Sequence, residues 1–169
     1  MTGIRVEITG AEEAIAQLGE VAARLDNPTP LYDEIGASLV VSTQARFERE
    51  EDPQGNPWPP SIRKLVEGGR TLTDTAGLVK SVTHEASREG VAVGTNKISA
   101  AVHQFGATIR AKTAKGLRFR LPGDNDFRIV QQVTIPARPF LGLDAEDEQE
   151  IIALTGDYLT EPFGGADAD

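Results

Sequence analysis

The sequence predicts an α+β fold, a small antiparallel β-sheet packed against a long helix, with N-terminal helices, an extended hairpin arm and a C-terminal helix. The first observation is a set of apolar stripes at helical spacing, over residues 11–25, 31–50 and 97–105. The second is a hairpin pattern, in which residues 81–95 alternate apolar and polar side chains around a turn at 88–90. Together these patterns predict helices that pack on a sheet.

The chain is long enough for one domain with its own core. Its 169 residues fall near the usual domain size, and we place that domain at residues 1–161. Residues 162–169 are small and acidic, and we expect a disordered tail there. Cysteine is absent and only two histidines occur, which excludes disulfides, thiolate metal sites and histidine-rich metal sites. With no signal-peptide run and no apolar stretch that suits a membrane span, we expect a soluble protein made in a cytoplasm, without membrane contact.

The N-terminal third predicts one strand and two helices. Residues 4–8 alternate apolar and polar side chains, the period of a half-buried strand. The apolar stripe of the first helix comprises Ile15, Leu18, Ala22 and Leu25. The stripe of the longer second helix comprises Leu31, Ile35, Leu39, Ser42 and Phe47. Neither stripe sustains three heptads, so we expect an ordinary packing pair of helices rather than a coiled coil.

A proline-rich loop surrounds the single tryptophan. This Trp58 loop, residues 52–60, holds four prolines and one glycine, and no regular element tolerates that composition. Such a segment resembles a ligand for aromatic grooves. The simpler interpretation, which we favour, is that Trp58 pins the loop to the domain by burying its ring. Beyond it, residues 73–81 predict a short capped helix.

The segment from residue 97 predicts a helix followed by an arm. The apolar face of the helix comprises Ile98, Ala101, Val102 and Phe105, and Gly106 is expected to end it. Residues 107–128 combine weak apolar alternation, glycines and basic side chains. They predict a long hairpin arm that is mobile until a neighbour orders it.

Residues 135–143, which we call the proline strap, hold two prolines that keep the backbone extended. The structural anchors that we expect here and elsewhere are Phe47, Trp58, Phe105, Phe140 and Leu141. Asp144 is the expected N-cap of the last helix. Arg138, fixed between the two prolines, is expected to meet a carboxylate at Asp144, at Glu148 or on a neighbouring copy.

Charge is distributed unevenly along a chain whose net charge is −9. Residues 110–138 are strongly basic, whereas residues 144–169 hold acids and no Lys or Arg. This polarity predicts either a head-to-tail contact between identical copies or an acidic helix that covers the basic segment of its own chain, and both alternatives stay open. Nucleic-acid binding is a poorer interpretation, because the protein as a whole is acidic. The candidate interface residues are Arg110, Lys112, Lys115, Arg118, Arg120, Arg128, Arg138, Asp144 and Glu148.

No combination of residues predicts catalysis. Neither His84 nor His103 has a serine or carboxylate at the spacing of a known catalytic motif. A dinucleotide fingerprint and a Walker loop are also absent from the sequence. We therefore predict no catalytic, cofactor-binding or metal-binding residues, and a protein that is not an enzyme.

Several short motifs occur in an order known from one family. They are Arg46-Phe47, Asp52-Pro-Gln-Gly-Asn-Pro-Trp58, Leu72-Thr-Asp-Thr-Ala-Gly-Leu78 with Ser81, Val93-Gly-Thr-Asn96, His103-Gln-Phe-Gly106 and Ile135-Pro-Ala-Arg-Pro-Phe-Leu-Gly142. Across roughly residues 40–152, this ordered set resembles the virion morphogenesis or tail-completion family of tailed bacteriophages, found in Mu-like and P2-like phages and prophages. The chain departs from that pattern at Ser99 or Ala100, where the family commonly has a tyrosine.

The resemblance implies a structural, non-catalytic protein at the head–tail junction, the neck, or the tail end of a virion assembled in the cytoplasm of a bacterial host. It implies a hexamer-like ring of identical copies that completes the tail and lets it join the head, in contact with other tail and head–tail connector proteins. Genomic DNA would pass through the channel without specific binding. The competing interpretation is a non-enzymatic peptide- or protein-binding module of a prophage or host, which would use the Trp58 loop or the basic arm.

Overall fold

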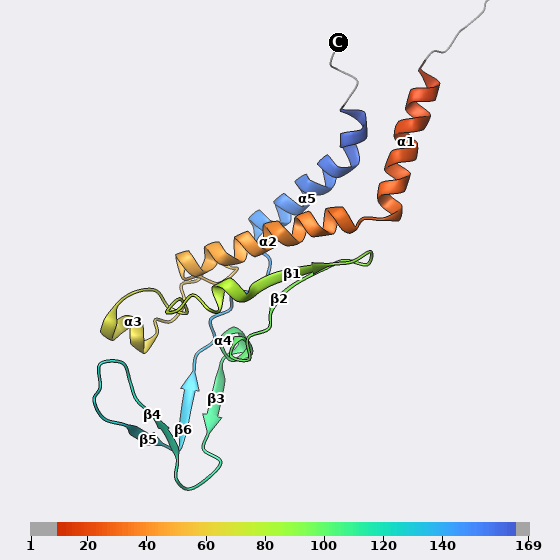
Figure 1. The fold of residues 1–169 in the computed structure, drawn as a ribbon. Helices are drawn as coiled ribbons and strands as arrows, with labels where there is room; N and C mark the ends of the chain where they lie inside the picture. Colours follow the sequence, from red (N-terminus) through yellow and green to blue (C-terminus); the bar gives the residue numbers. More distant parts are fainter. Residues whose placement is uncertain (1–9, 165–169) are drawn as a thin grey trace, which may run out of the picture.

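The computed structural model describes residues 10–164 and confirms the α+β class (Figure 1). Its helices are α1 Ala11–Asp26, α2 Thr29–Arg49, α3 Ile62–Glu67, α4 Ala100–Phe105 and α5 Ala145–Thr160, with 3-10 turns η1 Val79–Ser81 and η2 Glu161–Phe163. Its strands are β1 Val82–Ala86, β2 Val91–Thr95, β3 Ala107–Arg110, β4 Leu117–Phe119, β5 Arg128–Val130 and β6 Gln132–Ile135. The strand expected at residues 4–8 lies outside the described residues, as do residues 165–169 of the expected tail. That tail was expected to begin at residue 162, but Pro162 and Phe163 form part of η2.

Helix α2 organises the described part of the fold. The hairpin of β1 and β2 lies along one side of α2 and α5 lies along the other (Figure 1). β1 and β2 pair antiparallel in a register that runs from Val82 opposite Thr95 to Ala86 opposite Val91, as the alternation predicted. The buried residues of α2 are Leu31, Ile35, Gly36, Thr43, Arg46 and Phe47.

Gly36 sets how closely the hairpin approaches α2. A Cβ atom at this position would lie 2.6 Å from Cγ of His84 and 2.8 Å from Cγ2 of Val91. Both distances are too short for carbon atoms, so only glycine fits here without a shift of the hairpin. The hairpin and the helix therefore form two layers in direct contact.

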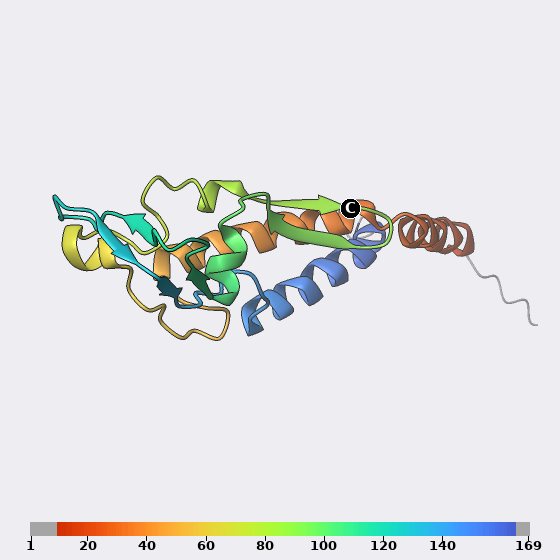
Figure 2. The same cartoon turned by 90° about the horizontal axis from the view of Figure 1, so that it is seen from below.

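Helix α1 does not pack along α2, and the expected packing pair is wrong. α1 projects beyond the body at the end of the molecule, and none of its residues is buried (Figure 2). The physical reason lies at Asn27, whose φ of −131° and ψ of 81° turn the chain out of the helical path before α2 begins. Arg24 holds α1 to the end of α5, donating to the Tyr158 carbonyl at 2.7 Å and to Glu161 Oε2 at 2.6 Å.

The helix expected over residues 73–81 is also wrong for most of its length. The structure places turns there, and only η1 at the end is helical. Leu72 and Ala76 have φ angles of 63° and 54°, outside the right-handed helical region. A short helix, α3, follows the Trp58 loop, and the Ser61 side chain caps it by accepting a hydrogen bond from the Lys64 backbone N–H.

The predicted arm is present and extends away from α2 (Figure 1). β3 pairs antiparallel with β6, from Ala107 opposite Ile135 to Arg110 opposite Gln132, and β4 pairs antiparallel with β5. Gly106, with a φ of 71°, ends α4 and lets the chain enter the arm. A Cβ at Gly106 would lie 2.9 Å from the backbone N of Ala137, so glycine is required at the base of the arm.

The proline strap returns the chain from the arm to α2 and leads into α5. Asp144 caps α5 as predicted, because its side chain accepts from the Asp147 backbone N–H at 2.9 Å. The Asp147 side chain accepts from the Asp144 N–H at 3.0 Å, which completes a capping box. Among the described helices, none has the length and apolar character needed to cross a membrane.

Candidate interaction surfaces

The proline strap is bound to α2 by a buried arginine. Arg46, in the last turns of α2, is only 1% exposed, and its Nη1 donates to the carbonyl oxygens of Phe140 at 3.3 Å and Gly142 at 2.8 Å. Its Nη2 donates to Asp144 Oδ2 at 2.8 Å and also pairs with Asp147. One guanidinium therefore joins the end of α2, the strap and the first turn of α5.

The positive charge of Arg46 faces an ionised carboxylate at this junction. Burial acts to raise the pKa of Asp144, but hydrogen bonds from the Asp147 backbone and from Arg46 outweigh it and lower that pKa below its usual value. Asp144 is therefore an anion at neutral pH, and its charge is neutralised by Arg46 within the same chain. Glu148, the other acid proposed as an interface residue, is exposed.

The Trp58 loop is pinned to the core, as predicted. The Trp58 ring meets the Phe47 ring edge to face at a centroid distance of 5.2 Å, and Phe47 is 5.2 Å from Phe140. The Trp58 indole N–H donates to the Pro139 carbonyl at 2.8 Å. Leu141 is half-buried against this cluster, so Phe47, Trp58, Phe140 and Leu141 all act as anchors. The Trp58 ring and its N–H are therefore both engaged within the chain.

Within residues 10–164, Arg138 binds backbone carbonyls and pairs with neither Asp144 nor Glu148, so the expected pairing with those two acids is wrong. The side chain is buried, its Nε donates to the Pro59 carbonyl at 2.6 Å, and one Nη donates to the Pro60 carbonyl at 3.3 Å. Extended proline-rich backbone makes no internal hydrogen bonds, so these carbonyls are free to accept from the guanidinium. Burial lowers the pKa of Arg138. Arg138 clamps the strap to the Trp58 loop inside its own chain, which is a fold-internal role.

Gln104 of α4 is, after Arg46 and Arg138, a third residue whose hydrogen bonds hold the proline strap, and the sequence interpretation missed it. Its Oε1 accepts from the backbone N–H groups of Phe140 at 3.0 Å and Leu141 at 3.1 Å, and its Nε2 donates to the Leu141 carbonyl at 2.8 Å. The interpretation also missed the junction of Arg46 with Asp147. The available signals were an arginine on the apolar side of α2 and an acid three residues after the N-cap.

The face of α4 that packs on the core is not the predicted one. Ala100 is buried and Gln104 is half-buried, whereas Phe105 is 79% exposed. Phe105 is therefore not an anchor, and this prediction is wrong. The physical reason is that α4 has only six residues, and the three hydrogen bonds of Gln104 fix which side faces the strap.

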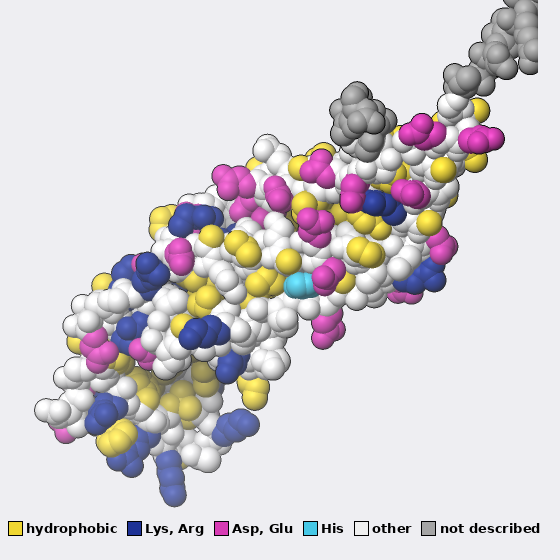
Figure 3. All heavy atoms as spheres, turned by 45° about the horizontal axis from the view of Figure 1, so that its top comes forward, with side chains coloured by type: hydrophobic (Ala, Val, Ile, Leu, Met, Phe, Trp, Pro, Cys, Tyr) yellow, Lys and Arg dark blue, Asp and Glu magenta, His cyan; other side chains and the backbone are white. Residues whose placement is uncertain are grey.

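The basic side chains of the arm are on the surface. The exposed residues are Arg110, Lys112, Lys115, Arg118, Arg120 and Arg128. Arg118 lies 3.9 Å above the Phe127 ring, and Arg128 pairs with Asp124 within the arm itself. Figure 3 shows Lys and Arg gathered toward the arm end of this face, and Asp and Glu toward the end with α1 and α5.

The acidic helix does not cover the basic segment of its own chain. α5 packs along α2, and the arm extends in another direction in both ribbon views (Figure 1, Figure 2). Within residues 10–164, no ion pair joins the arm to α5. The intramolecular alternative is therefore wrong, and the charges at the two ends stay available to other molecules.

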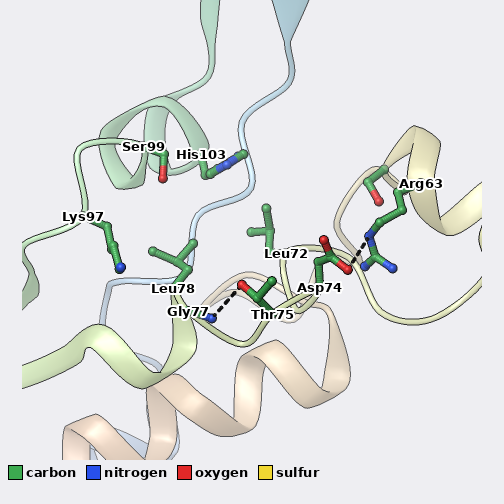
Figure 4. A pocket seen from close by; sticks show the side chains of 10 residues that line it. Arg63, Leu72, Asp74, Thr75, Gly77, Leu78, Lys97, Ser99 and His103 are labelled. Carbon is green, nitrogen blue, oxygen red and sulfur yellow. Dashed lines mark hydrogen bonds and ion pairs between the residues drawn. The ribbon is translucent and has the colours of Figure 1, made fainter. Parts of the chain in front are cut away.

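A pocket of about 400 Å³ opens between α3, the turns before η1 and α4 (Figure 4). Figure 4 shows the ion pair of Arg63 and Asp74 on one side and Lys97 on the other, with Leu72 and Leu78 between them. The Arg63 Nε lies 3.7 Å from Asp74 Oδ1, so one cation of the pocket is already balanced. The arrangement has no feature that selects a particular ligand.

His103 also borders this pocket, but it does not form a catalytic pair there. Burial, together with the positive charge of Arg138, lowers the pKa of His103 and favours the neutral ring. Its Nδ1 is buried without a hydrogen-bond partner. In the described part of the chain, no group of three or more His, Asp or Glu side chains could hold a metal ion.

The fold and these surfaces define a protein built around a strap, a protruding arm and charged ends. The chain belongs to the phage virion morphogenesis family, whose model matches residues 6–160. It is therefore a virion morphogenesis protein of a phage or prophage, as the motif order indicated. This family is structural, which suggests that the chain has no enzymatic role.

Two proteins, one of a prophage and one of a phage, are similar to most of the chain. The chain is 32% identical over 157 residues to a protein of Haemophilus influenzae described as Mu-like prophage FluMu G protein 2, covering 92% of this chain and 96% of the relative. It is 29% identical over 157 residues to the putative capsid assembly protein G of Escherichia phage Mu, covering 88% of this chain and 87% of the relative. No solved structure matches the chain.

Proposed function

We propose that the protein assembles head to tail into a closed, hexamer-like ring at the head–tail junction or tail end, where it completes the tail and allows head–tail joining. The observation that carries the proposal is the separation of charge, with an exposed basic arm at one end and an acidic surface at the other (Figure 3). A contact between two different surfaces of identical copies forms a ring when its rotation closes. Complementary charge favours this contact and sets its orientation.

Membership of the virion morphogenesis family supports a place in the particle. In this setting the ring contacts other tail and head–tail connector proteins. Genomic DNA passes through its channel without specific binding, because a chain with a net charge of −9 does not attract phosphates as a basic protein does. The arm is the surface through which each copy reaches its neighbour.

Native mass spectrometry at low and high salt tests the ring. We expect a closed oligomer at low salt and smaller species at high salt, because exposed charges are screened. Arg118→Glu with Arg120→Glu should abolish the oligomer. Lys80→Glu, which reverses another exposed basic side chain outside the arm, should leave it intact. A wild-type chain that is monomeric at every concentration and missing from purified virions would contradict the proposal.

The arm should gain order when the ring forms. Isolated two-stranded sheets are marginally stable in water, and the arm consists of two such sheets with exposed Ile109, Phe127 and Ile129. We expect fast amide hydrogen exchange over residues 107–128 in the free chain and slow exchange in the ring, with α2 protected in both. Equal and strong protection of the arm in both states would exclude this ordering.

A further inference from the structure

Helix α1 carries an apolar stripe that its own chain leaves uncovered. Ile15, Leu18 and Leu25 are 69%, 60% and 62% exposed, although their spacing is that of a buried helix face. α1 is attached to the body at its C-terminal end, through Arg24 and the end of α5. Most of the stability of a helix in a protein comes from packing of its apolar face, so a partner for this stripe would stabilise α1.

A second uncovered apolar surface lies around α4. Ile98 is 98% exposed and Phe105 is 79% exposed, and Ile109 at the start of the arm is exposed as well. Ile98 lies in the turn before α4, Phe105 is the last residue of α4 and Ile109 lies in β3, so the three exposed side chains flank one short helix. We call Ile98, Phe105 and Ile109 the α4 face.

The two apolar surfaces cannot meet within one chain. α1 projects from the end of the body where α2 begins, while α4 lies at the base of the arm (Figure 1). The view from below shows the same separation, with the hairpin of β1 and β2 between them (Figure 2). Any contact between these surfaces must therefore join two molecules.

The charges around the two surfaces are complementary. α1 carries the acids Glu12, Glu13, Glu20 and Asp26 and one basic residue, Arg24. Residues 97–120, which include the α4 face, hold Lys97, Arg110, Lys112, Lys115, Arg118 and Arg120 and no acid. Pairing α1 with a second α1 would bring acids against acids, whereas pairing it with the α4 face brings acids against bases.

We propose that the apolar stripe of α1 in one copy docks on the α4 face of the next copy. The inference rests on the proposed ring and names the apolar centre of its repeating contact, around which the acids of α1 and the bases of the arm form a charged rim. The stripe from Ile15 to Leu25 spans about 15 Å along the helix axis, enough for several apolar side chains of a neighbour.

Two surface variants and a control test the contact by native mass spectrometry. Ile15→Ser with Leu18→Ser removes the stripe, and Ile98→Ser with Phe105→Ser removes the α4 face. Each variant should weaken self-association by roughly 10- to 100-fold. Val41→Ser, at a residue of α2 that is 65% exposed and outside both surfaces, should associate like the wild type. All these side chains are exposed, so the melting temperatures of the monomers should change little.

A mixture of the two variants tests directly whether the contact is head to tail. Each retains the surface that the other lacks, so a head-to-tail contact should produce a one-to-one heterodimer and no ring. A wild-type ring that both variants also form would overturn this inference and leave the proposed function standing. The absence of a heterodimer from the mixture would likewise overturn this inference. Self-association of the variant that lacks the α4 face, as strong as that of the wild type, would overturn it too. A wild-type chain that neither associates nor enters virions would overturn the proposed function as well.

Discussion

The guanidinium of Arg46 lies 2.8 Å from the carboxylate of Asp144, although 98 residues separate them in the chain. The same guanidinium pairs with Asp147 and donates to two strap carbonyls. This junction explains how a strap with no regular structure can hold a fixed path between the arm and α5. It also positions the capping box at the start of α5, since both of its acids bind Arg46.

Arg46→Ala should strongly destabilise the monomer. It leaves the Asp147 carboxylate buried without its cation, and breaking a buried ion pair in this way costs about 3–5 kcal/mol. Arg49→Ala, which removes an exposed arginine paired with Glu51, should cost about 1 kcal/mol or less. Urea unfolding followed by circular dichroism measures both free energies of unfolding. Similar small losses for the two variants would show that the Arg46 junction does not stabilise the fold.

Stability should fall in two stages on acidification. His103 has a lowered pKa in the folded chain, so the unfolded chain binds a proton more readily once the pH falls below about 6.5, and stability begins to fall there. Asp144 also has a lowered pKa, so its contribution is complete above about pH 4 and is lost at lower pH. Unfolding free energies measured from pH 8 to pH 3 should show both stages. His103→Gln should remove the first stage and keep the second, and a first stage that survives this change would assign it to another group.

Gly36→Ala should separate the hairpin from α2. The added methyl group would overlap the His84 ring and Val91, and overpacking of this kind costs about 1–3 kcal/mol. Gly19→Ala is the matched control, because nothing lies within 4 Å of its added Cβ. It should stabilise helix α1 by about 0.5–1 kcal/mol, since alanine favours helices over glycine. Thermal melting of both variants checks the opposite signs, and equal shifts would argue against close contact at Gly36.

Phe140→Ala and Arg138→Ala should both destabilise the monomer. Phe140 is fully buried, and its truncation should cost about 3–5 kcal/mol. Arg138→Ala removes charge-assisted hydrogen bonds to Pro59 and Pro60, each typically worth about 1.5–3 kcal/mol. Arg138→Lys should restore part of this loss, because an ammonium group can reach one carbonyl but lacks the planar fork. If Arg138→Ala left the melting temperature unchanged and abolished only assembly, the earlier expectation of an interface role would be right.

The sequence by itself determined the elements that depend on local pattern. The long amphipathic run of α2, the alternation of the β1–β2 hairpin, the glycine at the base of the arm and the Asp144 cap each follow from a few neighbouring residues. The burial of Trp58 also followed, because a large ring in a proline-rich loop has few other ways to order that loop. Motif order was sufficient to identify the family.

Only the tertiary structure decided what covers each apolar face and which groups pair across the chain. Helical periodicity shows that one side of α1 or α4 is apolar, but an identical pattern results whether the core or another molecule covers that side. The partner of Arg138 was equally open, because the carbonyls that bind it lie 78 and 79 residues away in sequence. Such contacts depend on how distant segments pack, and a pattern of neighbouring residues does not specify which distant segment lies against it.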